Sequence, residues 1–251
     1  MPYSYALVIA AVSFLPFLIQ KFTGKFIWFA ACAIVAGIFQ GLYLFGPSII
    51  WLLVLTYLIS TVAELVSLKT PIACFGVKYA YNLKHPFFSS KIFLLGVYPL
   101  EISLAWVILK YLSFSLGIII ASAFGLPLFW EVLLIPLILV SLDFMFDPVS
   151  VRVSKLWSWE RGSGYFGIPW QNFLGWYMVG LVTTLIYAVF GGLHAVGFDY
   201  LLVLPVIFYA YFLQHIPKML KLDPVMGLIG SLPAVIWTIL GAYGLYVLWR
   251  P

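Results

Sequence analysis

Charged residues are scarce in this chain. Of its 251 residues only 8% are charged, with 13 Lys+Arg and 8 Asp+Glu, whereas 65% are hydrophobic and 19% aromatic. A soluble globular domain carries about 25% charged residues, and so few charges cannot cover a surface that faces water. The composition therefore excludes soluble enzymes, nucleic-acid-binding proteins and disordered chains, and it indicates a polytopic membrane protein.

Cysteine and histidine are also rare, and neither shows a ligand pattern. Cys32 lies in an apolar run and Cys74 in a distant basic loop, so we expect no disulfide. The histidines, His85, His194 and His215, are far apart, and no HExxH or CxxC spacing occurs. A glycine-rich phosphate loop and a second Asp-rich motif are missing too. We therefore expect no metal centre, no nucleotide and no cofactor.

Apolar stretches long enough to cross a bilayer run along the whole chain. A transmembrane helix needs about 20 mostly apolar residues, and the sequence predicts eight such spans in a single transmembrane helical domain covering residues 1–251. The first stretch lacks the basic start of a signal peptide, so we interpret it as a span. The expected spans are Tyr3–Gln20, Phe26–Phe45, Ser48–Leu68, Ile92–Lys110, Pro127–Phe146, Gln171–Phe190, Phe198–Ile216 and Val225–Trp249.

Residues 111–126 are apolar as well, but they are too few for a span of their own. Counting them as a ninth helix would move Arg152, Lys155 and Arg161 to the side opposite the other basic loops. We therefore expect a long or kinked continuation of the fourth helix, or a re-entrant segment covered by protein.

The basic residues alternate between loops. All Lys and Arg residues except Lys110 and Arg250 fall in the loops after the first, third, fifth and seventh spans. Basic loops face the cytoplasm, so we expect a multi-pass protein of the cell membrane with both termini outside. The net charge of +5 then reflects topology and not a nucleic-acid partner.

Several acidic residues fall inside the expected spans. An ionisable side chain at mid-helix costs about 2.5–3.5 kcal/mol on insertion scales, so it usually faces an interior site. Glu64 and Asp143 lie near the cytoplasmic ends of their spans, and Asp147 follows Asp143 by four residues, on the same helical face. Pro148 predicts that the helix ends at Asp147. These three acids predict a functional site in the cytoplasmic third.

Structural roles for these acids remain open. Glu64 with Lys69, and either aspartate with Arg152, would make ordinary ion pairs at helix ends.

Glu101 is expected to lie deeper, because it follows Lys91 by ten residues and so lies about 15 Å into its span. It has no basic neighbour at helical spacing. Glu101 is therefore a fourth candidate acid, with bracing of the bundle by a neutral, hydrogen-bonded side chain as the alternative.

The densest pattern is LDFMFDPVSVRVSKLWSWERGSGYFGIPWQNFLGWYMVG, from Leu142 to Gly180. An interfacial aromatic belt accounts for its tryptophans. It does not account for two acids, Asn172 and several glycine turns in one stretch.

This stretch resembles the membrane carotenoid hydratase family, which includes bisanhydrobacterioruberin hydratase and the gamma-carotene end-group hydratase. The matching features are Asp-x-x-x-Asp-Pro-Val, the Trp-x-Trp pair, Tyr165-Phe166-Gly167-Ile168-Pro169 and Asn172-Phe173-x-Gly175-Trp176. A second patch resembles the first half of that family and consists of Glu64, Phe75-Gly76, Tyr79, Tyr81, Pro99 and Trp106. By motif, the resemblance covers residues 64–180.

The resemblance implies a cofactor-free lyase that adds water to the terminal isopropylidene C=C of a linear carotenoid, giving a tertiary alcohol. Asp143 and Asp147 would be the acid–base pair, followed by Glu64 and Glu101 as candidates. One acid would protonate the alkene, and negative charge and aromatic faces would stabilise the tertiary cation. The implied substrate contacts are Tyr79, Tyr81, Trp106, Trp157, Trp159, Asn172 and Trp176.

The implied partners are the linear carotenoid, water and membrane lipid, with other enzymes of the same pathway as further candidates.

Two other functions stay open. Membrane lycopene cyclases look similar around the same loop, but they carry a Pro-x-Glu motif where this chain reads Pro169-Trp170-Gln171-Asn172, which favours hydration over cyclisation. Acids and broken helices inside a membrane are also typical of transporters for proton-coupled or lipid-like solutes. Acid-to-amide substitution would separate these functions, because only an enzyme would change the pigment.

Overall fold

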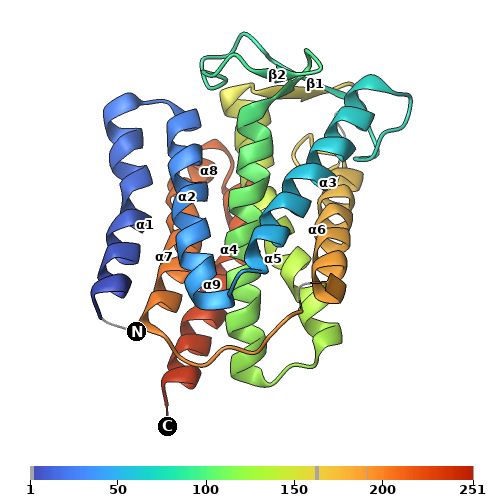
Figure 1. Ribbon diagram of the computed structural model, residues 1–251. Coiled ribbons are helices and arrows are strands. Elements are labelled where there is room, and N and C mark those ends of the chain that lie inside the picture. Colours follow the sequence, from blue (N-terminus) through green and yellow to red (C-terminus); the bar gives the residue numbers. More distant parts are fainter. Residues whose placement is uncertain (1–2, 162–163, 191, 251) are drawn as a thin grey trace.

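The apolar stretches become helices in the computed structural model, which describes residues 3–161, 164–190 and 192–250. Eight helical segments are long and apolar enough to cross a membrane, which confirms the expected all-helical, eight-span fold (Figure 1). The long helices are α1 (Tyr3–Thr23), α2 (Phe26–Phe45), α3 (Ile49–Lys69), α4 (Leu100–Phe124), α5 (Leu128–Val149), α6 (Trp170–Phe190) and α9 (Pro224–Trp249). The remaining span combines η2 (Tyr200–Leu202), α7 (Val203–Tyr211), η3 (Phe212–His215) and α8 (Ile216–Leu222).

Four short strands form a cap over one end of the bundle, and the two termini lie at the other end (Figure 1). β1 (Tyr79–Tyr81) pairs antiparallel with β4 (Trp157–Trp159), with Tyr79 opposite Trp159. β2 (Phe93–Leu94) pairs with β3 (Tyr98–Pro99). The β1–β4 pair joins the loop after α3 to the loop after α5, and so brings two distant stretches over the same end of the helices.

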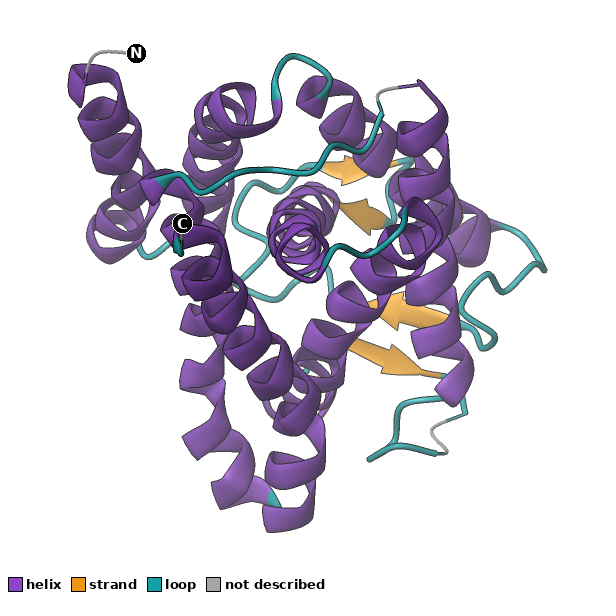
Figure 2. Cartoon of the chain, turned by 90° about the horizontal axis from the view of Figure 1, so that it is seen from below, coloured by secondary structure: helices purple, strands orange, loops and turns teal. Residues whose placement is uncertain are grey.

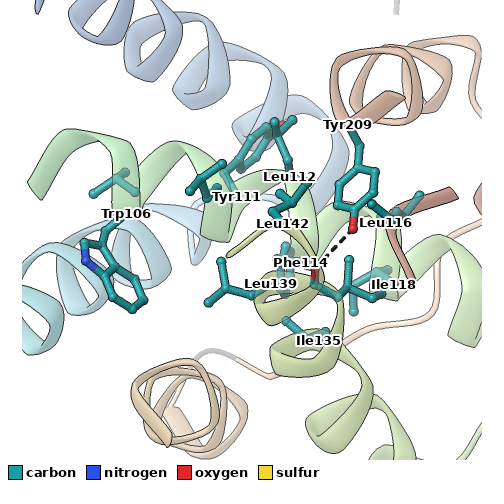
Figure 3. Packing of buried hydrophobic residues seen from close by; sticks show 14 of the residues in the cluster. Trp106, Tyr111, Leu112, Phe114, Leu116, Ile118, Ile135, Leu139, Leu142 and Tyr209 are labelled. Atoms are coloured by element: carbon teal, nitrogen blue, oxygen red, sulfur yellow. Dashed lines mark hydrogen bonds between the residues drawn. The ribbon is translucent and has the colours of Figure 1, made fainter. Parts of the chain in front are cut away.

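Helix α4 occupies the centre of the bundle and appears end on in the middle of Figure 2. It is the most buried of the described spans, with 83% of its apolar stretch inside the molecule. Figure 3 shows side chains of α4, such as Leu112 and Leu116, packed with Leu139 of α5. Tyr209 of α7 joins this core and donates a 3.1 Å hydrogen bond to the carbonyl of Ile138.

The expected fourth span, Ile92–Lys110, has the wrong boundaries. Residues 92–99 form the β2–β3 hairpin, whose turn contains Leu95 and Gly96 at positive φ. The helix begins only after Pro99 and continues unbroken to Phe124, so the expected continuation of the fourth helix is confirmed for residues 111–124. Two placements change with it: Glu101 lies in the first turn of α4, and Lys110 is a buried residue within the helix rather than the last residue of the span.

Two further boundaries differ from expectation. Helix α5 does not end at Asp147 but includes Pro148 and runs to Val149, followed by the π-helix η1 (Ser150–Ser154). Asp147 and Pro148 are both buried between helices, and this packing outweighs the local preference of a pre-proline residue. The seventh span, expected at Phe198–Ile216, extends from Tyr200 to Leu222 because short 3₁₀ turns carry the chain past the predicted end.

The cytoplasmic placement of the cap remains a prediction, and the free cysteines can test it. Cys74 is exposed in the cap and Cys32 is half-buried in α2. In a Cys32→Ala chain, a membrane-impermeant maleimide should leave Cys74 unlabelled in intact cells and label it after permeabilisation, measured by mass shift. As a control, Gly197→Cys in a chain without other cysteines, in the exposed loop before η2, should be labelled in intact cells. The reverse pattern would contradict the predicted orientation.

Candidate functional site

Three acids converge beneath the cap. Glu64 of α3 and Asp143 and Asp147 of α5 are 4%, 1% and 2% exposed. Glu64 is close enough to both aspartates for their charges to interact. Lys69 and Arg152 are exposed instead, so the helix-end ion pairs considered from the sequence are not the arrangement found. The three acids therefore lie together without an ion-pair partner from Lys69 or Arg152.

Asn172 bridges the two aspartates. Asp143 and Asp147 are one helical turn apart and share a face of α5, against which α6 packs. The Asn172 amide Nδ2 donates to Asp143 Oδ2 at 2.9 Å and to Asp147 Oδ2 at 2.6 Å. An amide nitrogen carries two hydrogens, so one residue satisfies both carboxyl groups and holds them side by side.

Glu64 accepts three hydrogen bonds. Tyr79 and Tyr81 of β1 both donate to its Oε2, the latter at 3.0 Å, and the indole Nε1 of Trp106 donates to its Oε1 at 3.2 Å. Burial, together with the nearby charge of Glu64, raises the pKa of Tyr79 well above its usual range, so its hydroxyl remains a donor. Three donors directed at one carboxyl group satisfy acceptor sites on both of its oxygens.

Aromatic rings surround the acids. Trp106 and Trp176 stack with their ring centroids 3.7 Å apart, and this stack joins α4 to α6. The ring of Trp159 lies 4.9 Å from that of Tyr79, while Trp157 lies near Asp147. The structure thus brings every predicted substrate-contact residue into one region together with Glu64, Asp143 and Asp147.

Glu101 has other partners. Its carboxylate accepts a 2.7 Å hydrogen bond from the backbone nitrogen of Ser90 and a 3.0 Å bond from the Ser90 hydroxyl. The side chain is fully buried, and these bonds fasten the loop before β2 to the first turn of α4. These hydrogen bonds agree with a bracing role for Glu101, the alternative to catalysis.

Lys110 is a neighbour of the candidate site that the motifs in the sequence do not predict. Its ammonium donates to the carbonyl of Gly180 at 2.8 Å and to the hydroxyl of Thr184 at 2.5 Å. Lys110 follows Trp106 by one helical turn, and Gly180 follows Trp176 by one turn, so this tie supports the tryptophan stack. The sequence signal for this role is a single lysine inside an apolar run.

Among the described residues, no group of three or more His, Cys, Asp or Glu side chains is arranged so that it could hold a metal ion.

A comparison with known families identifies the chain. A family model described as "Carotenoid biosynthesis protein" matches residues 23–238, which includes every member of the acid cluster. The chain belongs to this family. No curated protein and no solved structure matches it. This carotenoid biosynthesis protein thus combines eight candidate membrane spans with three buried carboxyl groups.

The bridging role of Asn172 predicts a stability defect. Replacing Asn172 by Ala leaves two buried carboxyl groups without their shared donor, and hydrogen bonds to charged groups contribute about 1.5–3 kcal/mol. We expect the purified protein in detergent to unfold several degrees lower than the wild type in a thermal scan. Asn82→Ala, which removes an amide from the exposed cap surface, should shift the midpoint far less. Equal midpoints for the two variants would refute the bridging role.

Proposed function

We propose that this carotenoid biosynthesis protein is a hydratase, which adds water to the terminal isopropylidene double bond of a linear carotenoid. The observation that carries the proposal is the buried cluster of Asp143, Asp147 and Glu64, with one amide bridging the two aspartates. A hydrocarbon substrate offers no polar group to bind or activate. Its alkene reacts with an acid, and the described site is rich in carboxyl groups and aromatic faces.

The first step uses the bridged pair. Two carboxyl groups side by side in a buried site do not both ionise readily, so such a pair retains one shared proton. That proton passes from Asp143 or Asp147 to the less substituted alkene carbon as the π bond breaks. The products of the step are a carboxylate and a tertiary cation on the carbon that bears the two methyl groups.

The cation is stabilised by what surrounds it. Glu64, with three donors on its carboxyl group, supplies a negative charge that does not need to move. The rings of Trp106, Trp176 and Tyr79 supply π faces, which attract a cation. The carboxylate and the aromatic rings both attract the substrate most strongly when positive charge develops on it. Stabilisation of that charged transition state accelerates the protonation step.

Water completes the reaction. Its oxygen bonds to the tertiary carbon, and its surplus proton passes to the carboxylate left by the first step. The aspartate pair is thereby restored, and the product is the substrate plus one water. The reaction is balanced without an oxidant, a reductant or a cofactor. The polyene would lie in the bilayer between helices with its end beneath the cap, in the predicted cytoplasmic third.

A cyclase would share the first step but quench the cation by ring closure. The segment that carries an acid in the cyclase pattern reads Pro169-Trp170-Gln171-Asn172 here, and Asn172 is occupied in binding both aspartates. This arrangement supports hydration. A transporter would use the same acids to carry protons, and it would leave the pigment unchanged.

The central test is pigment chemistry. In cells that make lycopene or bisanhydrobacterioruberin, expression of the chain should give carotenoids heavier by one or two waters, detected by liquid chromatography with mass detection. Asp143→Asn should lower product formation by about 10²–10⁴-fold, because it removes a proton carrier. Glu160→Gln, the same change at an exposed cap position, should retain activity.

The other outcomes are equally informative. A product of unchanged mass with a ring would replace hydration by cyclisation. Unchanged pigment in cells that contain normal amounts of the protein would refute the proposed reaction and favour transport.

The role of Glu64 predicts a separable kinetic effect. Glu64→Gln keeps the shape of the side chain but removes the charge that faces the cation. We expect kcat to fall about 10²-fold with little change in KM, since the lost interaction acts in the transition state. Steady-state assays in lipid nanodiscs measure both constants. A rise in KM at unchanged kcat would instead show that Glu64 only binds the substrate.

A further inference from the structure

A separate hollow lies on another side of α4. Its enclosed volume is about 50 Å³, and it is bounded by α1, α2, α4 and the α7–η3 segment, with a small contribution from α3. Figure 1 shows α1 and α2 as a pair beside α4. A space of about 10–15 Å³ holds one water molecule, so the hollow has room for the end of a ligand and not for a whole one. The lining is almost wholly apolar, so the hollow suits a hydrophobic ligand.

This cavity is distinct from the acid cluster. Helix α4 presents Trp106 to Glu64 and Tyr111 to the cavity, and five residues along a helix turn the side chain by about 140°. Helix α3 contributes Leu53 to the cavity and Glu64 to the cluster, and eleven residues correspond to about 16 Å along the axis. The two sites are therefore separated both around α4 and along α3.

The cavity contains one polar group in need of a partner. Gln40 is 2% exposed, and its Oε1 accepts a 2.7 Å hydrogen bond from the hydroxyl of Tyr111. Its Nε2 is buried and has no partner among the described residues. A buried amide without a partner is costly, and Gln40 lines the cavity. A ligand with an oxygen atom at this depth would remove that cost.

One wall of the cavity is aromatic. The ring of Phe17 contacts those of Phe29, Phe208 and Tyr211, with centroids 5.6, 5.4 and 4.8 Å away. Flat, rigid π surfaces suit a polyene better than a flexible acyl chain, because stacked or edge-on contacts add to the burial of apolar area.

We propose that this cavity binds the hydroxyl-bearing end of a linear carotenoid, with its tertiary alcohol at Gln40 and its polyene chain against the Phe17 wall. The choice of ligand rests on the proposed function, because hydration creates such an alcohol. A hydroxyl group both donates and accepts hydrogen bonds, so it pairs with the free end of the amide whichever way the amide is turned. A lipid acyl chain would fill the apolar space but leave Gln40 unpaired.

The test measures binding apart from turnover. Asp143→Asn chains in lipid nanodiscs are titrated with lycopene and with its terminal tertiary alcohol, and quenching of tryptophan fluorescence reports binding. The comparison is between Tyr111→Phe, which keeps the Gln40 amide, and Tyr111→Phe with Gln40→Leu, which removes it without leaving an unpaired tyrosine. The first chain should bind the alcohol about three- to tenfold more tightly than lycopene, and the second should show no preference.

A cavity-filling variant provides an independent readout. Ala33→Phe, at a half-buried lining position, should weaken binding of the alcohol while hydration activity, measured with Asp143 intact, is retained. A preference for the alcohol that survives the loss of Gln40, or equal binding of both carotenoids by the Tyr111→Phe chain, would overturn the proposal. If the chain prefers the alcohol through Gln40 but never hydrates lycopene, the proposed reaction is refuted and this binding site is supported. If the chain hydrates lycopene but shows no preference for the alcohol, only the binding site is refuted.

Discussion

The structure depends on the need to satisfy carboxyl groups buried in an apolar bundle. A carboxylate without partners is too costly to bury, and Glu64, Asp143 and Asp147 have almost no contact with solvent. Their donors come from three other elements: Asn172 from α6, Trp106 from α4 and the tyrosines from β1. Meeting this requirement fixes how α3, α4, α5 and α6 sit around one another, and it also fixes where the cap closes.

Helix α4 links this requirement to the rest of the molecule. It is surrounded by helices, so each of its faces serves a different neighbour. One face carries Trp106, which contacts Glu64 and stacks on Trp176. The next turn of the same helix carries Lys110, bonded to Gly180. Tyr111 points in a third direction and donates a hydrogen bond to Gln40 of α2. A shift of α4 would therefore disturb all three polar contacts together.

The cap gives the site its aromatic character. Tryptophans at a membrane boundary usually face the headgroups, but here the β1–β4 pair directs Trp157 and Trp159 toward Tyr81 and Tyr79. The same pair holds the two tyrosines where they reach Glu64. In the proposed reaction, a carotenoid end that enters from the bilayer would therefore meet these rings before it meets water.

The sequence by itself determined the features that depend on neighbouring residues. Hydropathy gave eight spans, and the four-residue spacing of Asp143 and Asp147 placed them on one face, because helical geometry is local. Contacts between distant elements came only from the tertiary structure. The bridge from Asn172 to both aspartates and the bonds from Tyr79 and Trp106 to Glu64 depend on how whole helices pack. Glu101 lies in the first turn of α4 and not deep in the span, as hydropathy alone predicts. The reason is that a hairpin ending at Pro99 decides where α4 begins.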